Sequence, residues 1–295
     1  MVNGNLRGAG LMLLAMAGFG LNDACMKYLS AELPLFQAVF LRGLGTAVLF
    51  ALIAWRMGLL HLRLSRRDRV LVVARSLAEA VSAFFFFNAL FNMPLANVTA
   101  IMQALPLTVT LAAVVFLREP VGWRRMLAIC IGFVGVLMIV RPGSDGFTIY
   151  SVSALAAVAV VTGRDLVTKQ ISAQVPSVTV AFAAALGVML FAGLGSLGED
   201  WVMPSPVAVG ALSVATLFIV MGYLCVVMAM RVGEMGFVSP FRYSGLVWAF
   251  LLGYLVFGEV PDLLTVAGSA LIVATGLFSL YREQRARRRL QPKVL

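Results

Sequence analysis

Residues 23–34 read DACMKYLSAELP, and residues 165–176 read DLVTKQISAQVP. Both stretches place an aspartate, a lysine and a proline in the frame D-x3-K-x6-P, which begins at Asp23 in the first case and 142 positions later in the second. The chain has only three lysines, and two of them occupy this frame. The pattern therefore predicts that the chain is duplicated within itself.

A second match supports the duplication with an offset of 140 positions. Its members in the first half are Ala89, Ala96, Val98, Thr99 and Glu119, which correspond to Ala229, Gly236, Val238, Ser239 and Glu259. We expect a first repeat at 1–145, a second at 146–282 and a basic tail at 283–295.

The composition indicates a membrane protein. Of the 295 residues, 61% are hydrophobic and only 12% are charged, whereas a soluble domain carries about 25% charge. Such a chain cannot cover itself with polar side chains in water. The three cysteines, Cys25, Cys130 and Cys225, lack the spacing of a metal site or of a disulfide framework. We interpret them as packing residues.

Ten segments are long enough to cross a bilayer, since a spanning helix needs about 20 mostly apolar residues. They are 6–29, 35–56, 69–91, 95–117, 124–141, 149–170, 177–197, 205–230, 236–257 and 263–281. The predicted fold class is all-α integral membrane, with ten transmembrane helices and short connections between them.

The basic residues indicate the orientation, because cytoplasmic segments of membrane proteins are enriched in Lys and Arg. With the N-terminus in the cytoplasm, the basic clusters at 56–69, 118–125 and 282–293 all lie inside, and the external connections hold Arg141 alone. Both termini are therefore expected in the cytoplasm. The net charge of +10 then reflects topology and attraction to anionic head groups, and no nucleic-acid partner is predicted.

Each copy contains five predicted spans, which is an odd number, so the second copy must enter the membrane upside down. Two inverted five-helix repeats are a transporter architecture. When the two halves exchange conformations, access to a central site passes from one side of the membrane to the other. The sequence therefore predicts a transporter that works by alternating access.

These features resemble the drug/metabolite transporter superfamily, specifically its EamA-type members with ten helices. The residues that carry the resemblance are the corners Glu119-Pro120 and Gly258-Glu259, the glycines Gly132, Gly135, Gly268 and Gly276, and Pro34 with Arg42. The pattern is also similar to YddG-type exporters of aromatic and other amino acids. The resemblance implies two EamA-like repeats in a bacterial inner (plasma) membrane protein that exports a small metabolite.

The resemblance also implies that eight helices surround a central cavity, with the fifth and tenth helices at the periphery. Segments 126–140 and 263–280 contain no ionisable residue, as helices that face lipid or an interface should. Glycine pairs such as Gly132 and Gly135 permit close helix contact, within one chain or between two. A monomer and a homodimer are both compatible with this pattern.

Ionisable residues inside spans are candidates for function, since each costs about 2.5–3.5 kcal/mol at mid-helix on insertion scales. Eight occur here: Asp23, Lys27, Arg42, Arg75, Glu79, Arg164, Asp165 and Arg242. Their surplus of positive charge suits a substrate with a carboxylate.

Three pairs of ionisable residues in the predicted spans are spaced i, i+4 on their helices, one of them through Lys169 near a span end. Arg75 and Glu79 begin a polar stripe on the third helix, either as an internal ion pair or as a substrate contact. For Asp23 with Lys27, and for Asp165 with Lys169, we expect structural pairs whose lysines extend toward the helix ends. Asn22 and Arg164, which precede the two aspartates, are expected to point elsewhere.

The ninth helix combines a helix breaker, a cation and aromatic side chains. Pro240 deletes one backbone hydrogen bond, and the freed carbonyl needs a partner or a water-lined cavity. The counterparts in the fourth helix include Thr99, Met102 and Gln103, with Pro106 as the breaker. We therefore expect both helices to line a cavity.

The substrate site is hypothesised from these residues. In this hypothesis Gln103 and Tyr243 face one cavity, Arg42 or Arg242 binds a carboxylate, Glu79 or Asp23 binds an amino group, and Tyr223, Phe86, Phe241 and Trp248 hold an apolar side chain. For each aromatic residue taken alone, packing in the core is favoured over contact with the substrate, because aromatic side chains fill any core.

The remaining alternatives concern substrate and class. The sequence contains no G-x4-G-K-[ST] and no H-E-x-x-H motif, so no ATP site, metal or other cofactor is predicted. Proton coupling through Asp23, Glu79 or Asp165 is left open. A drug, a sugar or a nucleotide-sugar could replace the amino acid as substrate. A membrane-embedded enzyme and a scaffold are the rivals from other classes, and no nucleophile–base pair supports the enzyme.

Overall fold

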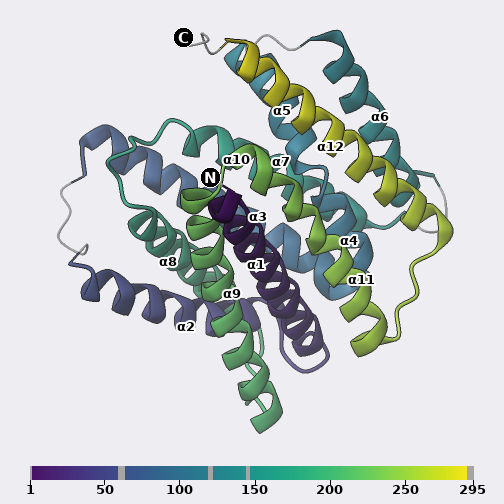
Figure 1. Ribbon diagram of the computed structural model, residues 1–295. Coiled ribbons are helices and arrows are strands. Elements are labelled where there is room, and N and C mark those ends of the chain that lie inside the picture. Colours follow the sequence, from purple (N-terminus) through teal and green to yellow (C-terminus); the bar gives the residue numbers. More distant parts are fainter. Residues whose placement is uncertain (1, 59–63, 119–121, 144–146, 291–295) are drawn as a thin grey trace.

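The computed structural model describes residues 2–58, 64–118, 122–143 and 147–290 (Figure 1). Within these ranges the chain is helical and has no strand. The elements are α1 (Val2–Leu29), α2 (Leu35–Arg56), α3 (Arg66–Asn92), α4 (Leu95–Met102), α5 (Leu105–Leu117), α6 (Trp123–Val140), α7 (Ile149–Thr168), α8 (Ser177–Gly195), η1 (Ser196–Gly198), α9 (Pro206–Val232), α10 (Met235–Val238), η2 (Ser239–Tyr243), α11 (Ser244–Phe257) and α12 (Leu263–Leu290), where η marks a 3-10 helix.

Ten stretches of the described ranges are long and apolar enough to cross a membrane, which confirms the all-α, ten-span prediction. The fourth and ninth spans are discontinuous. The fourth consists of α4 and α5, and the ninth passes through α10, η2 and α11. The last helix continues to Leu290, beyond the predicted end of the span at 281. The corner Glu119-Pro120 lies outside the described residues.

The two repeats interlock. The helix α1 packs along α9, and α3 packs along α7. Because α7 corresponds to α1 and α9 to α3, these two contacts are equivalent under the duplication. The helices α2 and α8 also pack together, as do α6 and α12, and each of these pairs joins two corresponding helices. Neither repeat therefore buries its helices without the other.

Close packing of α6 and α12 depends on two glycines, one from each repeat. A Cβ on Gly135 would lie 2.7 Å from the carbonyl oxygen of Gly268, and a Cβ on Gly268 would lie 2.6 Å from the carbonyl oxygen of Gly135. Small residues allow backbones to approach in this way in membranes. Figure 1 shows the two helices side by side at one edge of the bundle.

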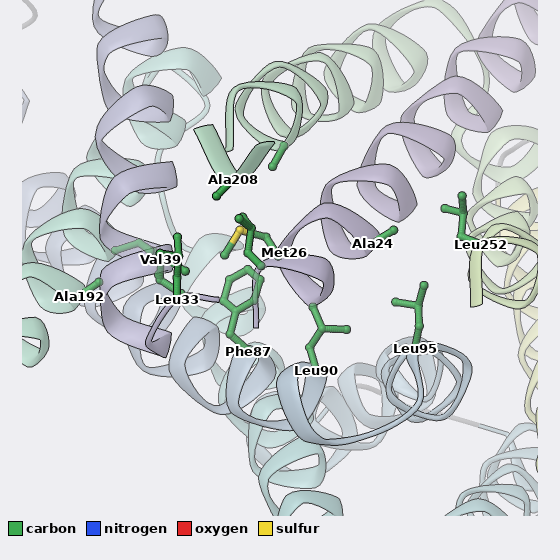
Figure 2. Close-up of a cluster of buried hydrophobic side chains, with 14 of the residues drawn as sticks. Ala24, Met26, Leu33, Val39, Phe87, Leu90, Leu95, Ala192, Ala208 and Leu252 are labelled. Atoms are coloured by element: carbon green, nitrogen blue, oxygen red, sulfur yellow. The ribbon is translucent and has the colours of Figure 1, made fainter. Parts of the chain in front are cut away.

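An even number of spans brings both ends of the chain to one end of the bundle, which we call the terminal face. The other end, the opposite face, carries the connection between α1 and α2. A buried hydrophobic cluster lies near this opposite face and includes Met26, Phe87, Leu90 and Leu95. Figure 2 shows Met26 beside Phe87, with Leu90 of α3 and Leu95 at the start of α4 nearby. Side chains from α1, α3 and α4 thus close the bundle at this end.

Candidate functional site: a cavity open at one face

A cavity of about 400 Å³ lies between the two broken helices, the end of α7 and α12. Its lining includes Gln103, Asp165, Arg242, Tyr243 and Gly276. It reaches the terminal face, where Lys169 at the end of α7 and Gln284 of α12 border it. The volume falls within the range of about 300–1,000 Å³ that is usual for small-molecule sites.

The helix breaks place Gln103 and Tyr243 on the cavity. The helix α4 ends at Met102, and the Gln103 backbone N–H closes a tight turn onto the carbonyls of Thr99 at 3.1 Å and Ala100 at 3.2 Å. Pro106 has no N–H, so the Met102 carbonyl loses its helical donor. Irregular backbone at membrane depth is tolerated where it borders a cavity, and Met102 and Pro106 both line this one.

The broken ninth span has the same role. Pro240 lies in the 3-10 segment η2, which presents Ser239, Arg242 and Tyr243 to the cavity. The hypothesis that Gln103 and Tyr243 lie on one cavity agrees with this geometry. Discontinuous helices of this kind form the substrate sites of many transporters.

Both signs of charge line the cavity. Arg242 is exposed as a residue and lines the cavity, and within the described part of the chain its side chain makes no hydrogen bond or ion pair. Asp165 accepts bonds from Arg164 at 2.7 Å and 2.9 Å, both on Oδ1. Its second oxygen accepts none among the described residues. A guanidinium and a carboxylate oxygen are therefore both available to a ligand.

Behind Asp165, a buried ionic network joins three helices. Glu79 of α3 accepts a bond from Arg164 of α7 at 3.0 Å and one from the hydroxyl of Tyr223 of α9 at 3.3 Å. Arg75 lies 3.4 Å from Glu79, so the two residues form the internal ion pair that was one of the two alternatives for the third helix. Neither Glu79 nor Tyr223 lines the cavity. The network ties α3, α7 and α9 together behind the wall that carries Asp165.

The aspartates of the duplicated frame have other partners than predicted. Asp23 accepts a bond of 2.8 Å from Asn22, and Asp165 is held by Arg164. The expectation that these preceding residues point elsewhere was wrong. The prediction that Asp23 pairs with Lys27 was also wrong, because Lys27 bonds to groups outside its own helix. A neighbouring long or amide side chain can fold back along the helix surface, whereas the end of Lys27 extends past the last turn.

Arg42 is a buried packing residue in this conformation. Its side chain is 8% exposed, bonds the Asn22 side-chain oxygen at 3.3 Å and lies over the Phe87 ring at 4.9 Å from the centroid. It does not line the cavity, so of the two arginines hypothesised for a carboxylate only Arg242 is placed there. Asp23, bonded to the same asparagine, does not line it either.

The hypothesised aromatic residues pack against hydrophobic clusters. Phe86 contacts two of them, and Phe241 and Trp248 contact a third around Met12 and Cys225. The ring of Tyr223 makes edge contacts with its neighbours in the bundle. None of the four lines the cavity.

The opposite face is closed by contacts between the repeats. Lys27 lies 3.1 Å from Glu259 and also bonds the carbonyls of Leu90 and Met93 at the end of α3. Glu259 in turn accepts the backbone N–H of Leu95 at 2.8 Å. One lysine and one glutamate thus connect α1, α3, α4 and the corner after α11.

Further bonds close the same face around α2 and α9. Ser205, the N-cap of α9, donates to Glu32 through its backbone N–H at 2.6 Å and its hydroxyl at 2.9 Å. Gln37 exchanges two bonds with the backbone of Val202, at 2.6 Å and 3.0 Å. Glu199 accepts the backbone N–H groups of Phe36 and Gln37 at the start of α2. The cavity therefore has one open end.

Sequence reasoning missed the part of α12 in the cavity. The tenth helix was expected at the periphery, but Gly276, Ser279 and Gln284 line the cavity near the terminal face. Arg125, at the start of α6, donates to Ser279 at 2.9 Å and to Thr110 at 3.0 Å. The prediction came from the family resemblance and was supported by the absence of charge, whereas the cavity wall here is built from a glycine and uncharged polar side chains. Among the described residues no group of His, Cys, Asp or Glu could hold a metal.

Comparison with known proteins gives a consistent result. The model of the EamA-like transporter family matches residues 6–141 and 148–281. The S-adenosylmethionine uptake transporter of Rickettsia conorii is 26% identical over 96% of both chains. The pseudopaline exporter of Pseudomonas aeruginosa is 28% identical over 89% of this chain and 92% of that protein. A solved crystal structure covers 96% of this chain and 98% of its own with a TM-score of 0.65 at 19% identity, which shows the fold alone.

Proposed function

Because the chain belongs to the EamA-like transporter family, we propose that it exports small metabolites that carry an amino-acid group, with neutral and aromatic amino acids as the simplest members. The protein moves its substrate by alternating access and leaves it chemically unchanged. Relatives with substantial coverage are named for S-adenosylmethionine uptake and for pseudopaline export. Transport of a small molecule is common to both, and the substrate differs between them.

The observation that carries the proposal is that Arg242 and Asp165, two side chains of opposite charge, line the same cavity. A guanidinium binds a carboxylate with charge-assisted hydrogen bonds, and a carboxylate oxygen binds an ammonium group in the same way. A zwitterionic amino-acid group satisfies both at once. S-adenosylmethionine, the substrate named for one relative, contains such a group in its methionine part.

Alternating access is supported by the difference between the two faces. The cavity reaches the terminal face, whereas the Lys27–Glu259 pair and the contacts around Ser205 close the opposite face. With the basic segments on the cytoplasmic side, both termini and the open end of the cavity lie on the cytoplasmic side of a bacterial inner membrane. Halves at 1–145 and 146–282 would then exchange conformations to open the other side.

A counterflow assay with labelled phenylalanine in proteoliposomes tests the proposal. Arg242→Gln removes a charged hydrogen bond worth about 1.5–3 kcal/mol, so exchange should fall at least about tenfold. The exchange rate of Asp165→Asn should fall by a similar factor. Arg231→Gln, at an exposed position at the end of α9, is the matched control and should keep the wild-type rate.

Competing ligands assign each charge to one group of the substrate. 3-Phenylpropionate lacks the amino group, so its inhibition should depend on Arg242 and not on Asp165. Phenethylamine lacks the carboxylate and should show the reverse dependence. The amino-acid assignment would fail if the wild-type protein did not exchange phenylalanine. It would also fail if inhibition by the two compounds weakened equally in both variants. Conversion of the label into another compound would favour an enzyme.

A further inference from the structure

The tip of Tyr243 rests directly against the backbone of α12. A Cβ on Gly276 would lie 1.8 Å from the Tyr243 hydroxyl oxygen and 2.6 Å from Cζ. No side chain other than hydrogen fits at position 276 while the ring keeps this place. Gly276 and Tyr243 come from different spans, and both line the cavity. The end of the phenol ring therefore packs into the space that a side chain at position 276 would occupy.

The Tyr243 hydroxyl is placed at a cost. The side chain is 6% exposed, and within the described part of the chain its hydroxyl has no hydrogen-bond partner. Burying an unpaired hydroxyl is unfavourable, and a phenylalanine would avoid that cost.

We propose that Gly276 and Tyr243 set the size of the substrate: by storing the ring against α12, the glycine keeps room for amino-acid-bearing metabolites larger than a free amino acid. The identity of the head group rests on the proposed function, whereas the size limit rests on the cavity alone. A volume of about 400 Å³ exceeds what a free amino acid fills. A larger residue at 276 displaces the ring, and the cavity is the space that borders it.

Thiol labelling tests the size limit without any assumption about the substrate. The reporter is Gln103→Cys in a full-length background with Cys25, Cys130 and Cys225 changed to alanine. N-ethylmaleimide and fluorescein-5-maleimide share one chemistry and differ in bulk. In Gly276→Ala, the rate with the fluorescein reagent should fall about tenfold or more, as expected for one added methyl group in a close-fitting pocket. The rate with N-ethylmaleimide should stay within about twofold of the parent.

Two further variants complete the test. Gly210→Ala places a methyl group on a spanning helix where no atom lies within 4 Å, and it should change neither rate. Tyr243→Leu shortens the side chain and should raise the rate of the fluorescein reagent, alone or combined with Gly276→Ala. This single variant decides the matter if Gly276→Ala does not fold. An unchanged ratio of the two rates in both Gly276→Ala and Tyr243→Leu would overturn the proposal.

Transport gives the second measurement. Counterflow of methionine and of S-adenosylmethionine compares two compounds with the same amino-acid group and different bulk. Gly276→Ala should reduce exchange of the larger compound about tenfold or more and that of methionine by less than about twofold. Failure of the wild-type protein to exchange either compound contradicts the proposed function, while the labelling result still decides the size limit. If the exchange of both compounds falls by the same factor in Gly276→Ala, the proposed size limit is contradicted.

Discussion

Lys27 and Glu259 form an ion pair of 3.1 Å between residues of different repeats. Lys169, which is the equivalent of Lys27 in the second repeat, borders the cavity at the other end of the bundle. The two lysines occupy the same place in the duplicated frame, and their surroundings differ because one face is closed and the other is open. Such asymmetry between equivalent positions is what alternating access requires.

Breaking this pair should open the opposite face. Glu259→Gln removes the negative charge between Lys27 and the Leu95 N–H, and loss of one partner of a largely buried pair is strongly destabilising. We expect a reporter at Asn22→Cys, in the cysteine-free background, to react at least about tenfold faster with an impermeant thiol reagent applied from the opposite face.

The matched control for that experiment is Asp262→Asn, since Asp262 pairs with Arg141 at the same face but is half exposed. Exposed pairs contribute about 0–1 kcal/mol, so this change should leave the labelling rate nearly unaltered. A reporter rate that is equal in wild type and Glu259→Gln would show that the pair does not hold this face closed.

Removal of Glu79 should destabilise the bundle. Glu79→Ala leaves Arg75 and Arg164 without their shared carboxylate, and loss of one partner from a buried ionic group costs about 3–5 kcal/mol. Thermal unfolding in detergent should show a clear drop in Tm. Asp200→Asn, at an exposed position, should change stability by no more than about 0.5 kcal/mol. Matching Tm values for both variants would show that the network is dispensable.

The orientation can be measured with two cysteine reporters in intact cells. Asp262→Cys lies between α11 and α12 at the opposite face, and Gln284→Cys lies on α12 at the terminal face. With both termini in the cytoplasm, an impermeant maleimide should label the first without permeabilisation and the second only after it. The reverse result would invert the topology and would place the open end of the cavity outside.

The opposite face should also respond to acid. The Thr265 backbone N–H donates to Asp262 at 2.8 Å, and this bond, with Arg141, holds the pKa of the Asp262 carboxyl below its usual value. A lowered pKa means that the ionised group stabilises the fold above pH about 4 and loses this effect as the pH falls through the lowered value.

The stability difference between wild type and Asp262→Asn should therefore be constant at neutral pH and shrink below pH about 4. It should be small, because the pair is exposed and screened. Thermal unfolding between pH 3 and pH 7 measures it. A difference that grows toward low pH would contradict the assigned direction.

The sequence by itself determined the ten spans, the duplication and the inversion of the second copy. Hydropathy over about 20 residues decides whether a segment can cross a bilayer, and an odd number of spans per copy decides its direction. The prolines at 106 and 240 also indicated the breaks that place Gln103 and Tyr243 on a cavity, because a missing N–H is a local property.

Only the tertiary structure decided which groups meet. Spacing of i, i+4 shows that Asp23 and Lys27 share a helix face, but it does not show that Glu259 stands nearer to the lysine. That depends on how the repeats interlock, as does the contact between Tyr243 and Gly276. A glycine carries no charge and no hydropathy signal of a site. Its role arises from the side chain that another helix places against it.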